Sequence, residues 1–510
     1  MARKSTYKPL LLTTTVRNPE RFRDMLFVLS KFKGLELTNE LATKICGELI
    51  RFGLYKPTKA LTDPIKDKWR SGIDLTDLEV SDLLRENPQE HKEAGFDAGW
   101  PSRFDTQFKL GHFFGFIYYK IGEPIEFSEL GDLYIQRTEY NGDSFYTNDE
   151  QQVFLNAFVN YHRKNPYQKV LNHNKPLVLL LGVLEELSKD TELGSAGLFV
   201  HELPFLLVCK DNDPVALAAE IINFRRVHRF NPSMETVFDA VGKYFGGWVL
   251  TKDKFETITK DYPDDLLRKF RLTGLFSLRG NGSVIAINND LREIAIYILQ
   301  NHNDLQEFSS EKEYFKYASS VDKHLITKAK PKTVTDSDFE QTLLSKWVGE
   351  ISVQTIKDEL LLLSRGKESK HPVLRVCPRP LRLEFLCSLL LKSRNPAATI
   401  VANYSRDDEG LPISHAPGNN PDIEVHDKDL LDLYEVTLTT GAAQAKAEFA
   451  PITRHLEDKI ALGQYKKENI QTIMVAPAIH ADFTTWIEFA KFKDAKRMAA
   501  LSISEFVSVS

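Results

Sequence analysis

The feature that most constrains this chain is an acidic pattern within residues 412–455. Asp422 opens an apolar, strand-like run, and a second such run ends with Glu435 and Val436. A Gly-containing turn then leads into an Ala-rich helix that carries Glu448. We expect the two runs to pair as a hairpin, so that Asp422 and Glu435 become neighbours and the helix brings Glu448 towards them.

Three converging carboxylates repel one another unless a cation lies between them. Ligation by oxygen alone selects Mg²⁺, Mn²⁺ or Ca²⁺ rather than zinc. Mg²⁺ held by a few carboxylates usually completes its shell with water and substrate phosphate, which favours a metal-dependent phosphodiesterase. On spacing alone, however, chance explains an Asp followed thirteen residues later by a Glu better than function does, because 27% of the residues are charged.

The whole block, and not the acidic pair alone, resembles a known catalytic segment. It is similar to that of the AlwI and BstNBI/MlyI group of type IIS restriction and nicking endonucleases, which has a variant of the PD-(D/E)xK nuclease fold. Thr437 stands where the common E-x-K ending has Lys, and the family shows the same departure. The matching residues are Ser414-His415-Ala416, Gly418-Asn419, Pro421-Asp422, Glu435-Val436-Thr437, Gln444, Lys446, Glu448, Pro451 and Thr453-Arg454-His455.

The resemblance implies a set of catalytic and metal-binding residues. Mg²⁺ is the implied cofactor, with Mn²⁺ able to substitute and Ca²⁺ expected to bind without supporting cleavage. Lys446 could orient the water or the scissile phosphate, or be an ordinary solvated helix residue. The implied catalytic residues are Asp422, Glu435, Glu448, Lys446, His455 and Gln444, and the implied metal ligands are Asp422, Glu435, the Val436 carbonyl and Glu448.

Two further residues are candidates for supporting this site. Glu384 lies on an expected helix over 381–392, where the family has an acid at the edge of the nuclease site. It could support a second metal or a water, or simply pair with Arg382. His415 belongs to the matching block and is a candidate for the same supporting role. Pro451, between Glu448 and His455, predicts a kink or break in their helix.

Composition limits the other classes of protein. The 510 residues are enough for two to four domains, and a net charge of −5 requires any DNA-binding surface to be local. The four cysteines form no C-x-x-C pair, so neither zinc nor disulfide frameworks are expected. We find no signal peptide and no apolar run long enough to span a bilayer. We therefore expect a reduced, cytoplasmic protein without membrane contacts.

Several basic residues before residue 300 are candidates for DNA contacts. Arg17 and Arg21 lie in a T-T-x-R-N-P-E-R opening that is similar to the AlwI-like enzymes, and could equally be ordinary helix-start arginines. Arg103 lies among aromatic residues over 95–120, where we expect the Phe and Tyr side chains to form core. Asn281 is in an Asn-Gly turn between two β-rich pieces.

A basic helix precedes that turn, which also contains Arg279. Helix followed by hairpin is the layout of a winged helix, whose tip can meet the DNA backbone. The alternative is an ordinary hairpin that caps a helical domain. Arg279 and Asn281 are therefore candidate DNA contacts, and their assignment to DNA depends on the family resemblance.

We accordingly predict an α+β multidomain protein. A mainly helical DNA-recognition region with winged-helix-like units spans 1–300, in two subdomains of about 1–145 and 146–300. A linker over 301–345 leads to an α/β PD-(D/E)xK-like cleavage domain over 346–510. No G-x-x-x-x-G-K-[ST] or H-E-x-x-H motif supports ATP-driven or zincin chemistry.

The predicted function is Mg²⁺-dependent hydrolysis of double-stranded DNA a few bases outside a short asymmetric site. One nuclease site cuts one strand, so a double-strand break requires a transient homodimer or a small catalytic subunit. The alternatives are a strand-specific nicking endonuclease, the large subunit of a heterodimeric restriction enzyme, a nuclease for branched DNA, and a non-catalytic winged-helix DNA-binding protein.

Overall fold

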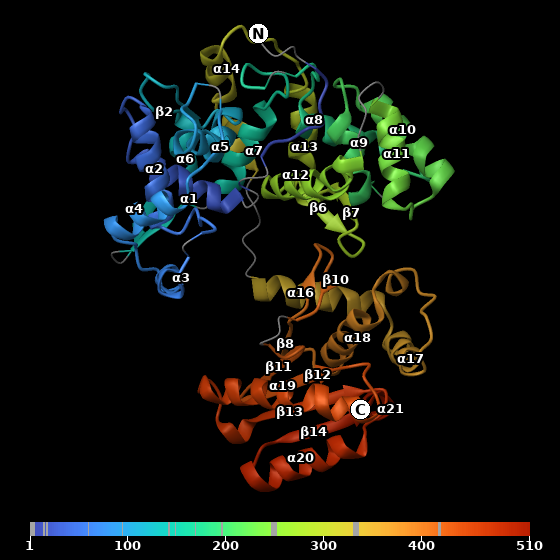
Figure 1. The fold of residues 1–510 in the computed structure, drawn as a ribbon. Coiled ribbons are helices and arrows are strands. Elements are labelled where there is room, and N and C mark those ends of the chain that lie inside the picture. The colour runs from blue at the N-terminus through green and yellow to red at the C-terminus, as the bar shows by residue number, and fades with distance from the viewer. Residues whose placement is uncertain are drawn as a thin grey trace. The chain divides into compact units, whose positions relative to one another are not determined.

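The computed structural model describes residues 6–13, 16, 19–59, 61–93, 95–140, 143–147, 149–168, 170–194, 197–245, 252–329, 336–416 and 420–509. The chain forms two compact units (Figure 1). The first comprises Met1–Ser277 and Ile285–Pro331, and the second comprises Leu278–Val284 and Lys332–Ser510.

The first unit is mainly helical, as its sequence predicts. Its helices are α1 (Pro19–Ser30), α2 (Asn39–Arg51), α3 (Asp63–Arg70), α4 (Asp77–Glu86), α5 (Trp100–Phe113), α6 (Glu129–Tyr134), α7 (Glu150–Asn160), α8 (Pro176–Leu187), α9 (Leu203–Val208), α10 (Pro214–His228), α11 (Met234–Phe245), α12 (Tyr262–Leu272), α13 (Arg292–Asn301), α14 (Glu311–Ala318) and α15 (Lys323–Lys328). Its strands are β1 (Ile117–Tyr118), β2 (Glu126–Phe127), β3 (Arg137–Tyr140), β4 (Asp143–Tyr146) and β5 (Leu198–Phe199), together with the parts of β6 (Phe276–Arg279) and β7 (Val284–Ile287) that lie outside Leu278–Val284.

Apolar and aromatic side chains explain the packing of this unit. Helix α8 is apolar on nearly all sides and is buried along most of its length, as a helix without a polar face must be. Phe104, Phe108 and Phe113 of α5 are likewise buried. The interpretation of the aromatic residues over 95–120 as core is therefore confirmed.

The predicted hairpin forms from β6 and β7, and β5 joins it in the order β5-β7-β6. Gly280, Asn281 and Gly282 all have positive φ in its turn, a conformation that Gly and Asn adopt more readily than other residues. Helix α12 precedes the hairpin, as expected. The assignment of these elements to a winged helix stays a prediction.

The segment over 301–345, predicted as a linker with partial helix, contains helices that pack into the first unit. Its helices α14 and α15 bury Tyr314 and Leu325 in the first unit. These apolar side chains are spaced among many charged ones, so the segment is polar in composition although it packs.

The second unit is a layered α/β domain. Its helices are α16 (Asp336–Glu350), α17 (Val353–Ser364), α18 (Arg379–Arg394), α19 (Ala442–Ala461), α20 (Ala481–Asp494) and α21 (Ile503–Ser508). Its strands are β8 (Thr399–Ala402), β9 (Ser405–Arg406), β10 (Pro412–Ser414), β11 (Ile423–Asp427), β12 (Leu430–Val436), β13 (Ile470–Ala476) and β14 (Met498–Ser502).

Five of these strands form one mixed sheet in the order β14-β13-β12-β11-β8. β11 and β12 form the predicted antiparallel hairpin, and β12, β13 and β14 are parallel. The edge strand β8 was not anticipated from the sequence. Alternating residues of β12 face two cores, because Leu431 and Leu433 pack under α19 and α20 whereas Tyr434 packs on the opposite side with α17 and α18.

Helix α19 does not end at Pro451. The helix runs from Ala442 to Ala461 with Pro451 inside it, so of the predicted kink or break, the break is wrong and the kink stays a prediction. Burial of Ile452 and Leu456 on the sheet keeps the segment helical although proline removes one backbone hydrogen bond. Glu448 and His455 consequently lie on one continuous helix.

Candidate active site

The β11–β12 hairpin brings Asp422 and Glu435 together. Ile423 pairs with Tyr434, so Asp422, the residue before β11, lies opposite Glu435 near the end of β12. The Val436 backbone N–H donates a hydrogen bond to Asp422 Oδ2 at 2.7 Å. Register and hydrogen bond together fix the two acids on adjacent strands, as the sequence predicts.

His455 contacts Glu435 from helix α19. Its Nδ1 lies 2.7 Å from Glu435 Oε1, and both side chains are largely buried. A His buried against a carboxylate orients that carboxylate, and its own second nitrogen lies on the far side of the ring. The predicted proximity of the helix-borne His to the acidic pair is therefore present in the fold.

Glu384 approaches the pair from the opposite layer, on α18. Its Oε1 contacts Nδ1 of the exposed His415, which follows β10. Its Oε2 is buried without a hydrogen-bond partner in the described part of the chain. A buried carboxylate oxygen without a partner is costly, which marks this position as one that an external group could satisfy.

The remaining predicted residues of α19 have different surroundings. Glu448 Oε1 lies 2.8 Å from the Thr437 hydroxyl, directly after β12. Gln444 is fully buried, donates to the carbonyls of Thr439 and Ala478, and accepts from the His480 N–H. Lys446 is exposed.

The acids are electrostatically coupled. Burial, followed by the negative charges of Glu435 and Glu384, raises the pKa of Asp422 well above its ordinary value. Burial and then the charge of Glu448 raise the pKa of Glu435, against the opposing effect of His455. Burial also raises the pKa of Glu384, although His415 opposes the shift. A cation bound among these acids would oppose all three upward shifts.

These oxygens fit a hard divalent cation. The donor set of carboxylates and a backbone carbonyl is the kind that Mg²⁺ prefers, and the partnerless Glu384 oxygen points to the same need for positive charge. Among the described residues, no three His, Cys, Asp or Glu side chains form a preassembled metal-binding group. The Asp422–Glu435 pair would therefore require the Val436 carbonyl, water or substrate oxygens to complete a shell.

A second polar network adjoins the pair and was missed in the sequence. Glu424 Oε2 lies 2.7 Å from Lys459 Nζ, and its Oε1 accepts from the Asn403 amide. Burial disfavours the charged form of Glu424, but the hydrogen bonds from His426, Lys459 and Asn403 lower its pKa to about 2. The signal was the alternation of Asp422, Glu424 and His426, because Glu424 and His426 lie on one face of β11 and Asp422 precedes them at the same spacing.

The candidate DNA contacts of the first unit are only partly accessible. Arg17 lies outside the described residues. Arg21 is half-buried, and its Nε has no hydrogen-bond partner among the described residues. Arg103 is half-buried and donates from Nε to Gln89 at 3.0 Å. Both contacts stay predictions.

The tip of the β6–β7 hairpin belongs to the second unit. There the Asn281 backbone N–H donates to Asp407 at 2.7 Å, and Arg279 Nε lies 3.9 Å from Glu409. These acids occupy part of the hydrogen-bonding capacity of the tip. The DNA-binding role of Arg279 and Asn281 stays a prediction.

The candidate site thus consists of acids on a β-hairpin in a mixed sheet that lies between helical layers. The model of the AlwI restriction endonuclease family matches residues 113–334 and 332–509. The chain therefore belongs to the AlwI restriction endonuclease family. No curated protein matches the chain.

Solved restriction endonucleases are among the structural neighbours. The small subunit of the heterodimeric restriction endonuclease R.BspD6I is 24% identical, covering 30% of this chain and 74% of its own, with a TM-score of 0.25. Restriction endonuclease FokI is 10% identical, covering 96% and 93%, also at 0.25. FokI bound to DNA is 12% identical, covering 100% and 95%, at 0.21. In the described part of the chain, no helix is long and apolar enough to cross a membrane.

Proposed function

We propose that this chain is a type IIS restriction endonuclease that hydrolyses double-stranded DNA a few bases outside a short asymmetric sequence, with Mg²⁺ as cofactor. The observation that supports the proposal is that Asp422 and Glu435 meet on one hairpin. The negative charge of Glu384 acts on Asp422, and one buried oxygen of Glu384 has no hydrogen-bond partner among the described residues. Membership of the AlwI family supplies the chemical context.

Asp422, Glu435 and the Val436 carbonyl would hold the cation. When bound, Mg²⁺ supplies charge neutralisation at the scissile phosphate and activation of a water. Mn²⁺ would substitute, and Ca²⁺ would bind without supporting cleavage. Glu384 supplies a further oxygen from α18, and Glu448 a further charge beside Thr437.

The other residues act on these ligands or on the substrate. His455 holds Glu435 in one orientation through their hydrogen bond. Gln444 joins the Thr439 and Ala478 backbones and so positions the start of α19 rather than touching DNA. Lys446 is exposed and is the side chain we assign to the scissile phosphate. His415 favours the charged form of Glu384 through their contact.

Sequence readout belongs to the first unit in this proposal. Arg17, Arg21 and Arg103 are assigned to DNA contacts there, and Arg279 and Asn281 to the hairpin tip. Phosphate contacts fix the register of such a protein, whereas contacts to base edges select the sequence. The cytoplasm, where DNA is accessible, is the proposed location.

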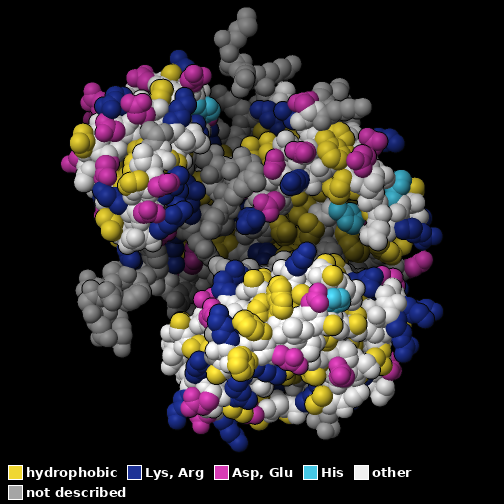
Figure 2. Space-filling model, turned by 60° about the horizontal axis from the view of Figure 1, so that its bottom comes forward, with side chains coloured by type: hydrophobic (Ala, Val, Ile, Leu, Met, Phe, Trp, Pro, Cys, Tyr) yellow, Lys and Arg dark blue, Asp and Glu magenta, His cyan; other side chains and the backbone are white. Residues whose placement is uncertain are grey.

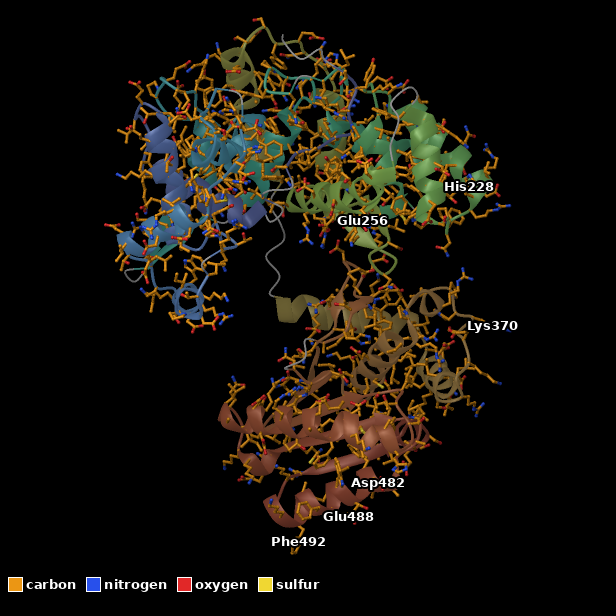
Figure 3. The ribbon with its side chains drawn as sticks, viewed as in Figure 1. His228, Glu256, Lys370, Asp482, Glu488 and Phe492 are labelled. Atoms are coloured by element: carbon orange, nitrogen blue, oxygen red, sulfur yellow. The ribbon has the colours of Figure 1, made fainter. Side chains whose placement is uncertain are left out.

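The second strand requires a second nuclease site, and we assign it to another copy of this chain. Helix α20 buries Phe483 and Ile487 but leaves Phe492 91% exposed and Phe489 59% exposed. Figure 2 shows hydrophobic side chains on the face of the second unit that is turned forward, and Figure 3 shows Phe492 at its outer edge. Exposed aromatic patches of this kind mark interaction surfaces.

Charge complementarity favours a second copy as the occupant. Asp482 and Glu488 precede the outer aromatic residues of α20, and Lys491 and Lys493 lie in its last turn. Two such helices packed antiparallel place the acidic part of each beside the basic part of the other. A two-fold interface of this type repeats the same contact on both subunits.

The test is digestion of plasmid DNA by the purified protein with Mg²⁺, with both ends mapped by run-off sequencing and Asp422→Ala as control. Fixed ends beside one shared sequence, absent with the variant, are expected. Ends on one strand only would identify a nicking enzyme or the large subunit of a heterodimer. Failure of both proteins to cut while binding DNA would favour the non-catalytic DNA-binding protein, and equal cutting would overturn the assigned site.

A further inference from the structure

The loop between α17 and α18, residues 365–378, carries four exposed cations. We call it the basic loop. Arg365, Lys367, Lys370 and Arg375 are exposed, and none of them forms an ion pair with any residue that the structure describes. Figure 3 shows Lys370 at the edge of the second unit. The only acid in the loop is Glu368.

Many other cations of the second unit have a partner. Arg406 lies 3.4 Å from Glu340, Lys459 lies 2.7 Å from Glu424, and Lys496 lies 2.7 Å from Glu457. Other cations of the unit without an ion pair among the described residues, such as Lys428 and Lys466, lie in other segments. Clustered like charges repel one another, so this arrangement costs free energy unless an anion is bound.

The basic loop is held by a buried polar network. The Ser369 hydroxyl donates to Glu359 Oε1 on α17 at 2.9 Å, and both side chains are largely buried. The His371 N–H donates to the same hydroxyl at 3.0 Å. Because Ser369 is anchored inward, its neighbours Lys367 and Lys370 are left on the surface.

The same loop is tied to the helix that enters the candidate site. Arg382 on α18 is almost fully buried, donates to the Leu374 carbonyl, and pairs with Glu368 at 3.3 Å. Glu368 is itself exposed, but its ion pair is with the buried Arg382 and not with a cation of the basic loop. Glu384 follows Arg382 by two residues, about 3 Å along the helix axis. The basic loop therefore leads directly into the N-terminal end of α18, the same end that contains Glu384.

We propose that the basic loop binds the phosphate backbone of duplex DNA beside the cleavage site, independently of sequence. The inference rests on the proposed nuclease function, and the basic loop would be the surface of the second unit that contacts the DNA substrate. Exposed Lys and Arg side chains contact phosphate oxygens and release condensed counterions. Such contacts carry no base information, which suits a nuclease domain that cuts outside the recognised sequence.

The experiment compares two triple variants of the full chain that remove equal charge. The loop variant is Arg365→Gln, Lys367→Gln, Lys370→Gln. The control is Lys428→Gln, Lys466→Gln, Lys467→Gln, which removes three exposed cations of the same unit outside the loop and outside α20. Binding to a fluorescein-labelled, random-sequence duplex is measured by anisotropy from about 50 to about 200 mM salt. Plasmid cleavage with Mg²⁺ is followed alongside, and thermal melting confirms folding.

The expected result is a weaker salt dependence for the loop variant. Each lost phosphate contact lowers the slope of log affinity against log salt by about 1, so the loop variant loses about 3. Its affinity falls at least roughly tenfold at the lowest salt, and the difference shrinks as salt rises. Cleavage shows a higher KM with little change in kcat. The control retains nearly the wild-type slope.

The failures of the two proposals are distinguishable. Equal slopes for the loop variant and the control overturn the basic-loop assignment, whether or not the wild type cuts. If the wild type binds DNA and never cuts it, the nuclease proposal fails, and the slopes still decide whether the loop contacts phosphate. A loop variant that loses kcat at unchanged KM and slope also overturns the assignment.

Discussion

Among single residues, Asp422 is the proposed metal ligand whose burial is expected to lower the stability of the metal-free protein near neutral pH. Its pKa is raised in the folded protein, mainly by burial and then by Glu435 and Glu384. A raised carboxyl pKa contributes stability that is fully present below the ordinary Asp pKa of about 4 and is lost as pH rises through the folded value. The metal-free protein should therefore become less stable towards neutral pH.

Asp422→Asn should consequently raise the Tm of the metal-free protein at neutral pH. Removing one negative charge relieves the repulsion, and each kcal/mol gained corresponds to roughly 2–4 °C for a domain of this size. The gain should shrink as pH falls, because wild-type Asp422 is then protonated. Mg²⁺ should stabilise the wild type and not the variant. Thermal melting across pH, with and without Mg²⁺, tests this, and a variant with a lower Tm at neutral pH would contradict it.

His455 is expected to position Glu435 rather than to react. In His455→Gln the 2.7 Å contact with Glu435 is altered, and loss of such a supporting partner commonly costs about 10–100-fold in metal affinity or activity. The Mg²⁺ concentration for half-maximal cleavage should rise accordingly. His480→Asn, which retains a helix-capping side chain at the start of α20, is the matched control. Unchanged Mg²⁺ dependence in His455→Gln would refute the positioning role.

At the scale of elements, α19 contains an internal proline between its two site residues. Pro451 removes one backbone hydrogen bond and crowds the preceding turn, at a cost of up to about 3 kcal/mol. Pro451→Ala should increase the free energy of unfolding by roughly 1–3 kcal/mol. Denaturant unfolding measures it, with the exposed Ala450→Gly as the opposite control, expected to lose about 1 kcal/mol. A Pro451→Ala protein less stable than wild type would show that the proline fits the native helix.

At the scale of the whole molecule, cutting both strands should depend on the outward face of α20. Phe489→Ser combined with Phe492→Ser removes exposed aromatic surface, so the fold should persist while self-association on DNA weakens. Nicked circles should accumulate in place of linear plasmid, with first-strand cutting retained. Gel analysis over a range of enzyme concentrations tests this, with the exposed Val353→Ser on α17 as control. Unaltered linear product would refute this interface, and linear product restored only by another protein would indicate a separate small subunit.

The chain by itself determined the elements of the site. Local patterns predicted the β11–β12 hairpin, the helix after it and the acids on them, because alternation and turn residues act over a few positions. The long co-linear match to the family indicated the same chemistry. The hairpin of β6 and β7 was predicted for the same local reason.

Only the tertiary structure decided what lies across from those elements. It placed Glu384 beside His415, and it paired Glu424 with Lys459. It also directed the Gln444 side chain to a backbone carbonyl. It also kept α19 helical through Pro451 and buried α14 and α15 in the first unit. These outcomes depend on burial and on partners distant in sequence, whose free energies exceed local propensities and leave no short-range pattern to read.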